Sequence, residues 1–176
     1  MSLLESIQKD FASISETAGL FLKELPGNDI KKDVILAAEL AGLLLQRGSD
    51  VDLSKLEPGN VVLGAIDDET YELMHRFLFA AAQSGGLDPT GLFKPELPED
   101  IDVYYPEITE YETRLYSICK DQDVKPEYYP FISAFTAIRL IMAGAELEIM
   151  EPGAGLAMTL YHINAGSKTV PYDSSK

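Results

Sequence analysis

Two stretches of this chain of 176 residues, Val34–Leu45 and Phe131–Ala145, are almost wholly apolar. Each carries one charged residue, Glu39 in the first and Arg139 in the second. A helix that is apolar nearly all round must be buried on nearly all sides, whereas a surface helix shows one apolar stripe. Neither stretch reaches the ~20 apolar residues that cross a bilayer, so we expect both inside the protein. The chain is therefore predicted to fold around two central helices.

Composition limits the partners that the chain can take. Its 29 acidic and 14 basic residues give a net charge of −15. This sign disfavours nucleic-acid phosphates and anionic membranes, so we expect neither as a partner. The single cysteine, Cys119, allows no intrachain disulfide, and the first residues show no secretion signal. We therefore expect an acidic protein of the cytoplasm.

The hydrophobic periods predict a mostly all-α fold, a single helical bundle of about six helices over residues 1–170, with a flexible tail at 171–176. Short strands would fit at Val61–Leu63 and Leu147–Ile149. Prolines exclude a continuous helix from Leu87 to Tyr105, which predicts a lid, a binding loop, an extended arm or a plain spacer between two helical halves. The expected helices are Leu3–Leu25, a second one capped by Asn28 or Asp29 and ending at Gly48, a third capped by Asp67 and ending near Ser84, Glu107–Lys120, a fifth from Pro126 or Tyr129 to Gly144 or Glu146, and a last one from Pro152 or Gly153 that ends before Gly166.

The first expected helix has a narrow apolar seam whose spacing alternates between three and four residues. This seam can pack on the protein's own domain or against a second copy, and the second option predicts a homodimer. Five residues would form that interface: Leu4, Ile7, Phe11, Ile14 and Phe21.

Polar residues on the two apolar helices mark a candidate ligand pocket. Lys32, Glu39 and Gln46 recur every seven residues on one thin polar line, which predicts that Glu39 lies at an edge reached by water. Arg139 interrupts the other helix, and it must reach solvent, pair with an acid such as Glu39, or line a cavity. A pocket under the 87–105 segment would have four polar lining residues: Arg139, Glu39, His75 and Tyr104.

The sequence carries no complete signature of a metal or catalytic site. Glu72 and His75 match half of a di-iron pattern, but the other ligands are missing. Cys119 falls on an apolar helix face, where cysteine acts as a small hydrophobe. We therefore expect no metal and no cofactor.

Six tyrosines gather within a short part of the chain, which is typical of a binding surface or of rings that seal helix seams. They are Tyr104, Tyr105, Tyr111, Tyr116, Tyr128 and Tyr129.

Two functions remain open. The leading expectation is a non-enzymatic protein that acts through contacts with itself or with a protein partner. The alternative is a small-molecule-binding protein or an enzyme, with its pocket beside Arg139.

Overall fold

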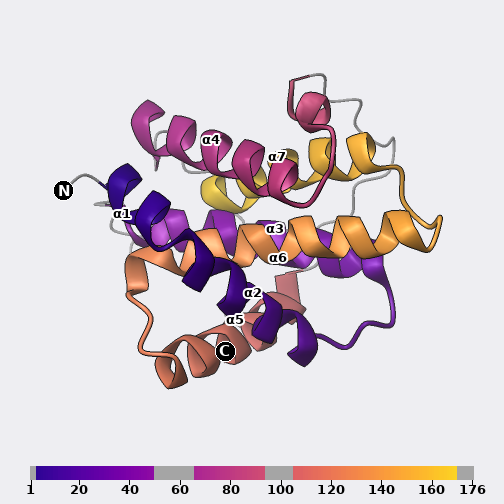
Figure 1. The fold of residues 1–176 in the computed structure, drawn as a ribbon. Coiled ribbons are helices and arrows are strands. Elements are labelled where there is room, and N and C mark those ends of the chain that lie inside the picture. The colour runs from indigo at the N-terminus through magenta and orange to yellow at the C-terminus, as the bar shows by residue number, and fades with distance from the viewer. Residues whose placement is uncertain (1–2, 50–65, 94–104, 170–176) are drawn as a thin grey trace.

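The computed structural model describes residues 3–49, 66–93 and 105–169, which form an all-α fold (Figure 1). As expected, Asp29 and Asp67 cap helices, because their side chains accept hydrogen bonds from the backbone amides of Lys32 and Thr70. The α-helices are α1 (Leu3–Lys9), α2 (Phe11–Glu24), α3 (Ile30–Arg47), α4 (Asp68–Ser84), α5 (Tyr105–Asp121), α6 (Tyr129–Glu146) and α7 (Pro152–Lys168), and the 3₁₀ helices are η2 (Pro89–Leu92) and η3 (Pro126–Tyr128).

Helices α3 and α6 form the centre of the bundle, which confirms the prediction from the two apolar stretches. Thirteen of the 18 residues of α3 are buried, and so are 12 of the 18 residues of α6. In Figure 1 these helices cross the middle of the molecule, with α4 and α7 on one side and α5 on the other. Ser133 of α6 ties them together, because its hydroxyl donates to the carbonyl of Ala37 at 2.7 Å. Among the described residues, no helix is long and apolar enough to cross a membrane.

The closest helix contact is the crossing of α3 and α7, where glycines replace side chains. A β-carbon at Gly42 would lie 2.0 Å from the carbonyl oxygen of Ile163. A β-carbon at Gly166 would lie 2.2 Å from the carbonyl oxygen of Glu39. Because both obstacles are backbone atoms, the two helix axes can approach this closely only without those carbons. Ala37, Ala38 and Ala41 of α3 are fully buried as well.

The predicted single helix over Leu3–Leu25 is wrong in one respect, because the chain breaks at Asp10 into α1 and α2. Asp10 leaves helical geometry at φ −99° and ψ 13°, and its carboxylate accepts a 2.7 Å hydrogen bond from the hydroxyl of Tyr128. The heptad spacing continues across the break, so the pattern alone does not reveal it. The break instead coincides with a tertiary contact to η3.

The apolar seam of this segment packs on the chain's own core. Ile7, Ile14 and Phe21 are buried at 3%, 1% and 0% exposure. Leu4 and Phe11 are half-buried, and the Phe11 ring contacts the rings of Phe77 and Phe135. In the monomer, the seam therefore packs against its own domain, which is one of the two alternatives that the sequence allows.

Two further expectations need a different account. Leu147–Ile149 is a turn and not a strand, because Ile149 donates its amide to the carbonyl of Gly144 and closes the end of α6. Within the 87–105 stretch, Pro89–Leu92 forms η2, which packs on α7. The expected strand at Val61–Leu63 and the tail at 171–176 lie outside the described residues.

Candidate binding site

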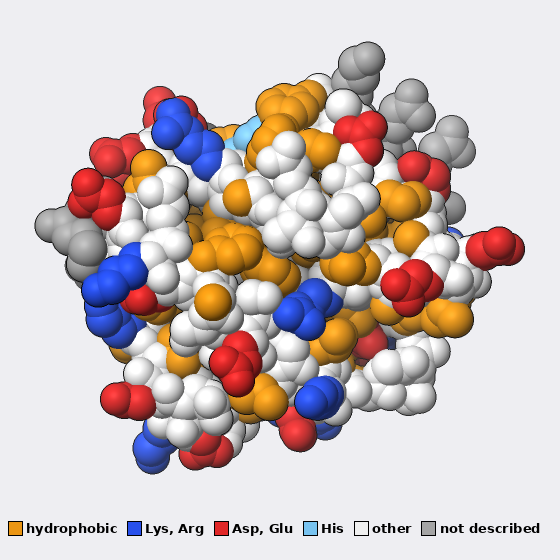
Figure 2. All heavy atoms as spheres, in the orientation of Figure 1, with side chains coloured by type: hydrophobic (Ala, Val, Ile, Leu, Met, Phe, Trp, Pro, Cys, Tyr) orange, Lys and Arg blue, Asp and Glu red, His pale blue; other side chains and the backbone are white. Residues whose placement is uncertain are grey.

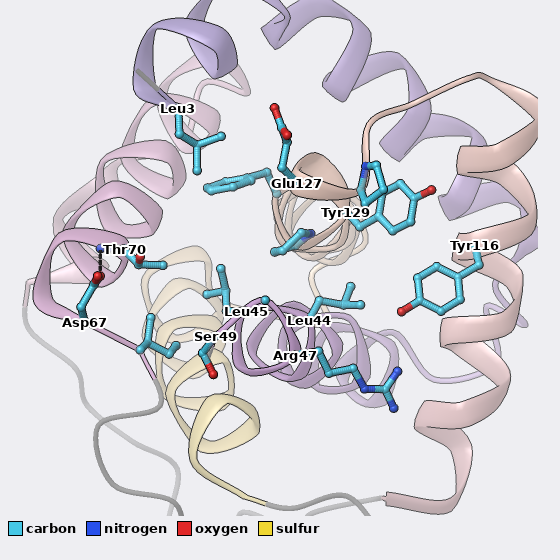
Figure 3. A pocket seen from close by; sticks show the side chains of 15 residues that line it. Leu3, Leu44, Leu45, Arg47, Ser49, Asp67, Thr70, Tyr116, Glu127 and Tyr129 are labelled. Atoms are coloured by element: carbon cyan, nitrogen blue, oxygen red, sulfur yellow. Dashed lines mark hydrogen bonds between the residues drawn. The ribbon is translucent and has the colours of Figure 1, made fainter. Parts of the chain in front are cut away.

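A pocket of about 690 Å³ opens where the carboxyl end of α3 meets the first turns of α4 and α6 (Figure 3). This volume lies within the range of small-molecule sites, about 300–1,000 Å³. Its walls come from α1, α3, α4, α5, η3 and α6 and from the residues that flank α3 and α4. The lining residues are Leu3, Leu44, Leu45, Arg47, Gly48, Ser49, Ile66, Asp67, Thr70, Tyr116, Pro126, Glu127, Tyr129, Pro130 and Phe131.

The inner wall of the pocket is apolar and rigid. Leu44 and Leu45, from the last turn of α3, are 7% and 8% exposed, and Phe131, from the first turns of α6, is 1% exposed. These residues belong to the main hydrophobic core, so the floor of the pocket is held by the two central helices. An apolar group that entered would replace water on a preformed surface, which is the dominant source of affinity for small ligands.

Two tyrosines form one side of the pocket. Tyr116 on α5 and Tyr129 at the start of α6 lie with ring centroids 5.5 Å apart, and Tyr116 is 38% exposed. Partial burial raises the pKa of Tyr129, which keeps its hydroxyl neutral and able to donate. Such rings offer apolar area together with a hydrogen-bonding group. The tyrosine cluster in the sequence therefore contributes two rings to the pocket.

Three charged residues line the pocket, and they differ in their intramolecular partners and in their orientation. Arg47 makes an ion pair with Glu112 of α5, which is 7% exposed. Asp67 is engaged as the cap of α4, and hydrogen bonds from Thr70 lower its pKa. The carboxylate of Glu127 points away from the middle of the pocket in Figure 3. Among these groups, the guanidinium of Arg47 is the one cation.

The three described residues of the sequence-predicted pocket, Arg139, His75 and Glu39, are not brought together. Arg139 reaches α2, where its Nη2 donates at 3.0 Å to both the carbonyl and the hydroxyl of Ser15. His75 lies on α4 against Phe93, with ring centroids 5.1 Å apart. Glu39 contacts α7, and Tyr104 lies outside the described residues. The trial pair of Glu39 and Arg139 is therefore not formed.

Glu39 is fully buried, so the prediction that it lies at a wet edge is wrong. It is 0% exposed, and a 2.9 Å hydrogen bond joins its Oε1 to Nδ1 of His162, which is also 0% exposed. At Glu39 the polar line on α3 faces α7 beside the glycine crossing, and α7 supplies this partner. Gln46, one position further along that line, is buried too, and its amide has no hydrogen-bond partner among the described residues.

Burial of Glu39 gives the folded protein a pH dependence. Desolvation raises its pKa above the ordinary 4.5, and the contact with His162 lowers it by a smaller amount. As the pH rises above 4.5, the unfolded chain loses the Glu39 proton before the folded protein does. The Glu39 side chain therefore lowers the free energy of unfolding as the pH rises. Glutamine does not titrate, so a Glu39→Gln variant should not show this loss. Between low and high pH, its free energy of unfolding should rise relative to that of wild type by about 1.4 kcal/mol for each pKa unit by which Glu39 is shifted. Urea unfolding of both proteins between pH 4 and pH 8 measures this difference. The same dependence of the free energy of unfolding on pH in wild type and variant would contradict the expectation.

A second hollow of about 120 Å³ lies between α1 and α4. Leu4, Ile7 and Phe11 line it from the first segment, and Leu73 and Phe77 line it from α4. On the face shown in Figure 2, hydrophobic side chains show in the middle with a few charged ones among them, and further acidic and basic side chains lie along the outline. This hollow is too small for more than a single apolar group.

The one cysteine of the chain is not among the residues that line the pocket. Cys119 is fully buried in the core, and burial raises the pKa of its thiol to about 12, so it stays protonated. Across residues 3–49, 66–93 and 105–169, no group of three or more histidine, cysteine or acidic side chains could hold a metal ion. The described lining of the pocket offers apolar surface and hydrogen-bonding groups.

Comparison of the chain with protein-family models, with curated proteins and with solved structures finds no match.

Proposed function

We propose that this chain is a binding protein for a small amphipathic molecule, which it holds in the pocket at the end of α3. The observation that carries the proposal is the joint lining of this pocket: buried Leu44, Leu45 and Phe131 form the floor, and the paired rings of Tyr116 and Tyr129 form one side. An apolar floor with a few polar groups at the rim is the usual design of a small-molecule site.

This function fits the structure better than association through the first helical segment. The apolar face of that segment is already covered, since Ile7, Ile14 and Phe21 are buried in the monomer. A second copy could reach them only if α1 and α2 left the core. Among the described residues, in contrast, no helix has to move before a ligand contacts the walls of the pocket.

The neutral fluorescent dye N-phenyl-1-naphthylamine tests the proposal. We expect saturable binding to wild type with a stoichiometry of one. Tyr116→Ala should weaken that binding by about three- to tenfold, because an aromatic contact contributes about 0.5–1.5 kcal/mol. Fluorescence titration measures both constants.

Tyr161→Ala is the matched control for this experiment. Tyr161 is also 38% exposed, but it lies on α7 outside the pocket lining. Its loss should leave dye affinity within twofold of wild type. Equal weakening by the two variants, or no saturable binding to the folded wild type, would overturn the proposed function.

A further inference from the structure

We infer that the ligand of this pocket carries an anionic head group, and that Arg47 binds it. This inference rests on the proposed function and assigns the chemical class of the ligand. It concerns the rim of the pocket, where Arg47, Asp67 and Glu127 carry the described charges.

An ion pair with Glu112 holds the side chain of Arg47 in place. Its guanidinium contacts the carboxylate of Glu112, which is nearly buried on α5, while the Arg47 side chain keeps 40% of its surface exposed. A guanidinium has five N–H donors in a rigid plane, so one carboxylate does not exhaust them. Glu112 therefore fixes the direction of the group and leaves donors for a second anion.

Tyr116 adds a neutral donor next to this cation. Glu112 and Tyr116 are four residues apart on α5, so their side chains are neighbours on one face of that helix. Because Arg47 contacts Glu112, its guanidinium lies beside the face that carries Tyr116. In Figure 3 the hydroxyl of Tyr116 points to the side of the pocket on which Arg47 lies. A carboxylate, sulfonate or phosphate oxygen could accept from both.

The carboxylates of the acidic lining residues lie away from the guanidinium of Arg47 in Figure 3. Asp67 is turned to the backbone amide of Thr70, at 2.7 Å, and Glu127 points out of the pocket. The net charge of −15 acts at longer range, and salt screens it beyond about 8 Å at physiological ionic strength. The local donors therefore decide which head group is preferred, and the apolar floor takes the rest of the molecule.

Two dyes with one skeleton test the inference. 1-Anilinonaphthalene-8-sulfonate is N-phenyl-1-naphthylamine with an added sulfonate group, so their affinities differ through that anion. We expect the sulfonate to bind wild type more tightly than the neutral dye. Arg47→Gln should weaken sulfonate binding by about 10- to 150-fold, since hydrogen bonds to charged groups contribute about 1.5–3 kcal/mol. The same variant should leave the neutral dye within twofold.

Lys23→Gln is the charge-matched control, because Lys23 is exposed on α2 and outside the pocket. It should leave the affinity of both dyes unchanged. Arg47→Gln leaves the carboxylate of Glu112 without its partner and could fail to fold for that reason. In that case the double variant Arg47→Gln/Glu112→Gln, which removes both charges, is used in the same titrations. Displacement of the sulfonate dye by octanoate but not by octan-1-ol would extend the preference to carboxylates.

The outcomes separate the two proposals. Equal binding of the two dyes, or an equal effect of Arg47→Gln on both, would overturn the anionic head group while the pocket stands. Failure of the neutral dye to bind saturably to the folded wild type would overturn the pocket itself.

Discussion

A Gly42→Ala variant should lose about 3 kcal/mol or more of its free energy of unfolding, although it adds only one methyl group. The new carbon would lie 2.0 Å from the carbonyl oxygen of Ile163 and 2.7 Å from the amide nitrogen of Ser167. Both atoms belong to the backbone of α7, so relief requires that helix to move as a unit. Urea denaturation followed by circular dichroism measures the loss.

Gly19→Ala is the control for that substitution. Gly19 also lies within a helix, but the nearest atom to its β-carbon is Nη1 of the Arg139 side chain, at 3.3 Å. Alanine is the better helix former by about 1 kcal/mol, and the arginine end can shift. We therefore expect Gly19→Ala to be neutral or stabilising. Similar losses in the two variants would contradict the close crossing of α3 and α7.

The second large effect is expected at the buried pair on the same crossing. His162→Leu should cost about 3–5 kcal/mol, because it leaves the carboxylate of Glu39 buried without its partner. The double variant Glu39→Leu/His162→Leu should recover much of that loss, because an apolar pair of similar volume carries no desolvation penalty. Equilibrium unfolding of both single variants and of the double variant measures the coupling.

The other histidine of the chain gives a matched control. His75 is half-buried, and its Nε2 lies 3.5 Å from the carbonyl oxygen of Leu92, which is at the limit of a hydrogen bond. His75→Leu should therefore change stability by less than about 1 kcal/mol. If His162→Leu were equally mild, or if the double variant lost the sum of the two single losses, the buried pair would not have the role described.

The central helices could be predicted from the sequence because burial on all sides leaves a local trace. Val34–Leu45 and Phe131–Ala145 are apolar all round, and only core helices tolerate that composition. The caps at Asp29 and Asp67 were equally local, since a cap bonds to an amide three residues away. These features depend on neighbours along the chain.

The polar partners could not be predicted, because they depend on which helix faces which. The period of seven placed Glu39 and Gln46 on one line, but the same line fits a wet edge and a buried contact with α7. Gly42 and Gly166 decide between these by drawing α7 onto α3. They lie 124 positions apart, so no local pattern joins them.

The pocket was missed for a similar reason. Its floor comes from Leu44, Leu45 and Phe131, which read as ordinary core residues in the sequence. Arg47 reads as a charge in the last turn of a helix, which is common because it complements the helix dipole. The one signal that pointed to this place was the tyrosine cluster, of which Tyr116 and Tyr129 reach the pocket.

Amide chemical shifts during titration with N-phenyl-1-naphthylamine test the central claim, that the end of α3 is a ligand site. Saturable shifts are predicted for Leu44, Leu45, Thr70, Tyr116 and Phe131, while Leu147 and Tyr161 stay unchanged. No saturable shift, or shifts gathered at Leu73 and Ala80 beside the small hollow, would contradict it.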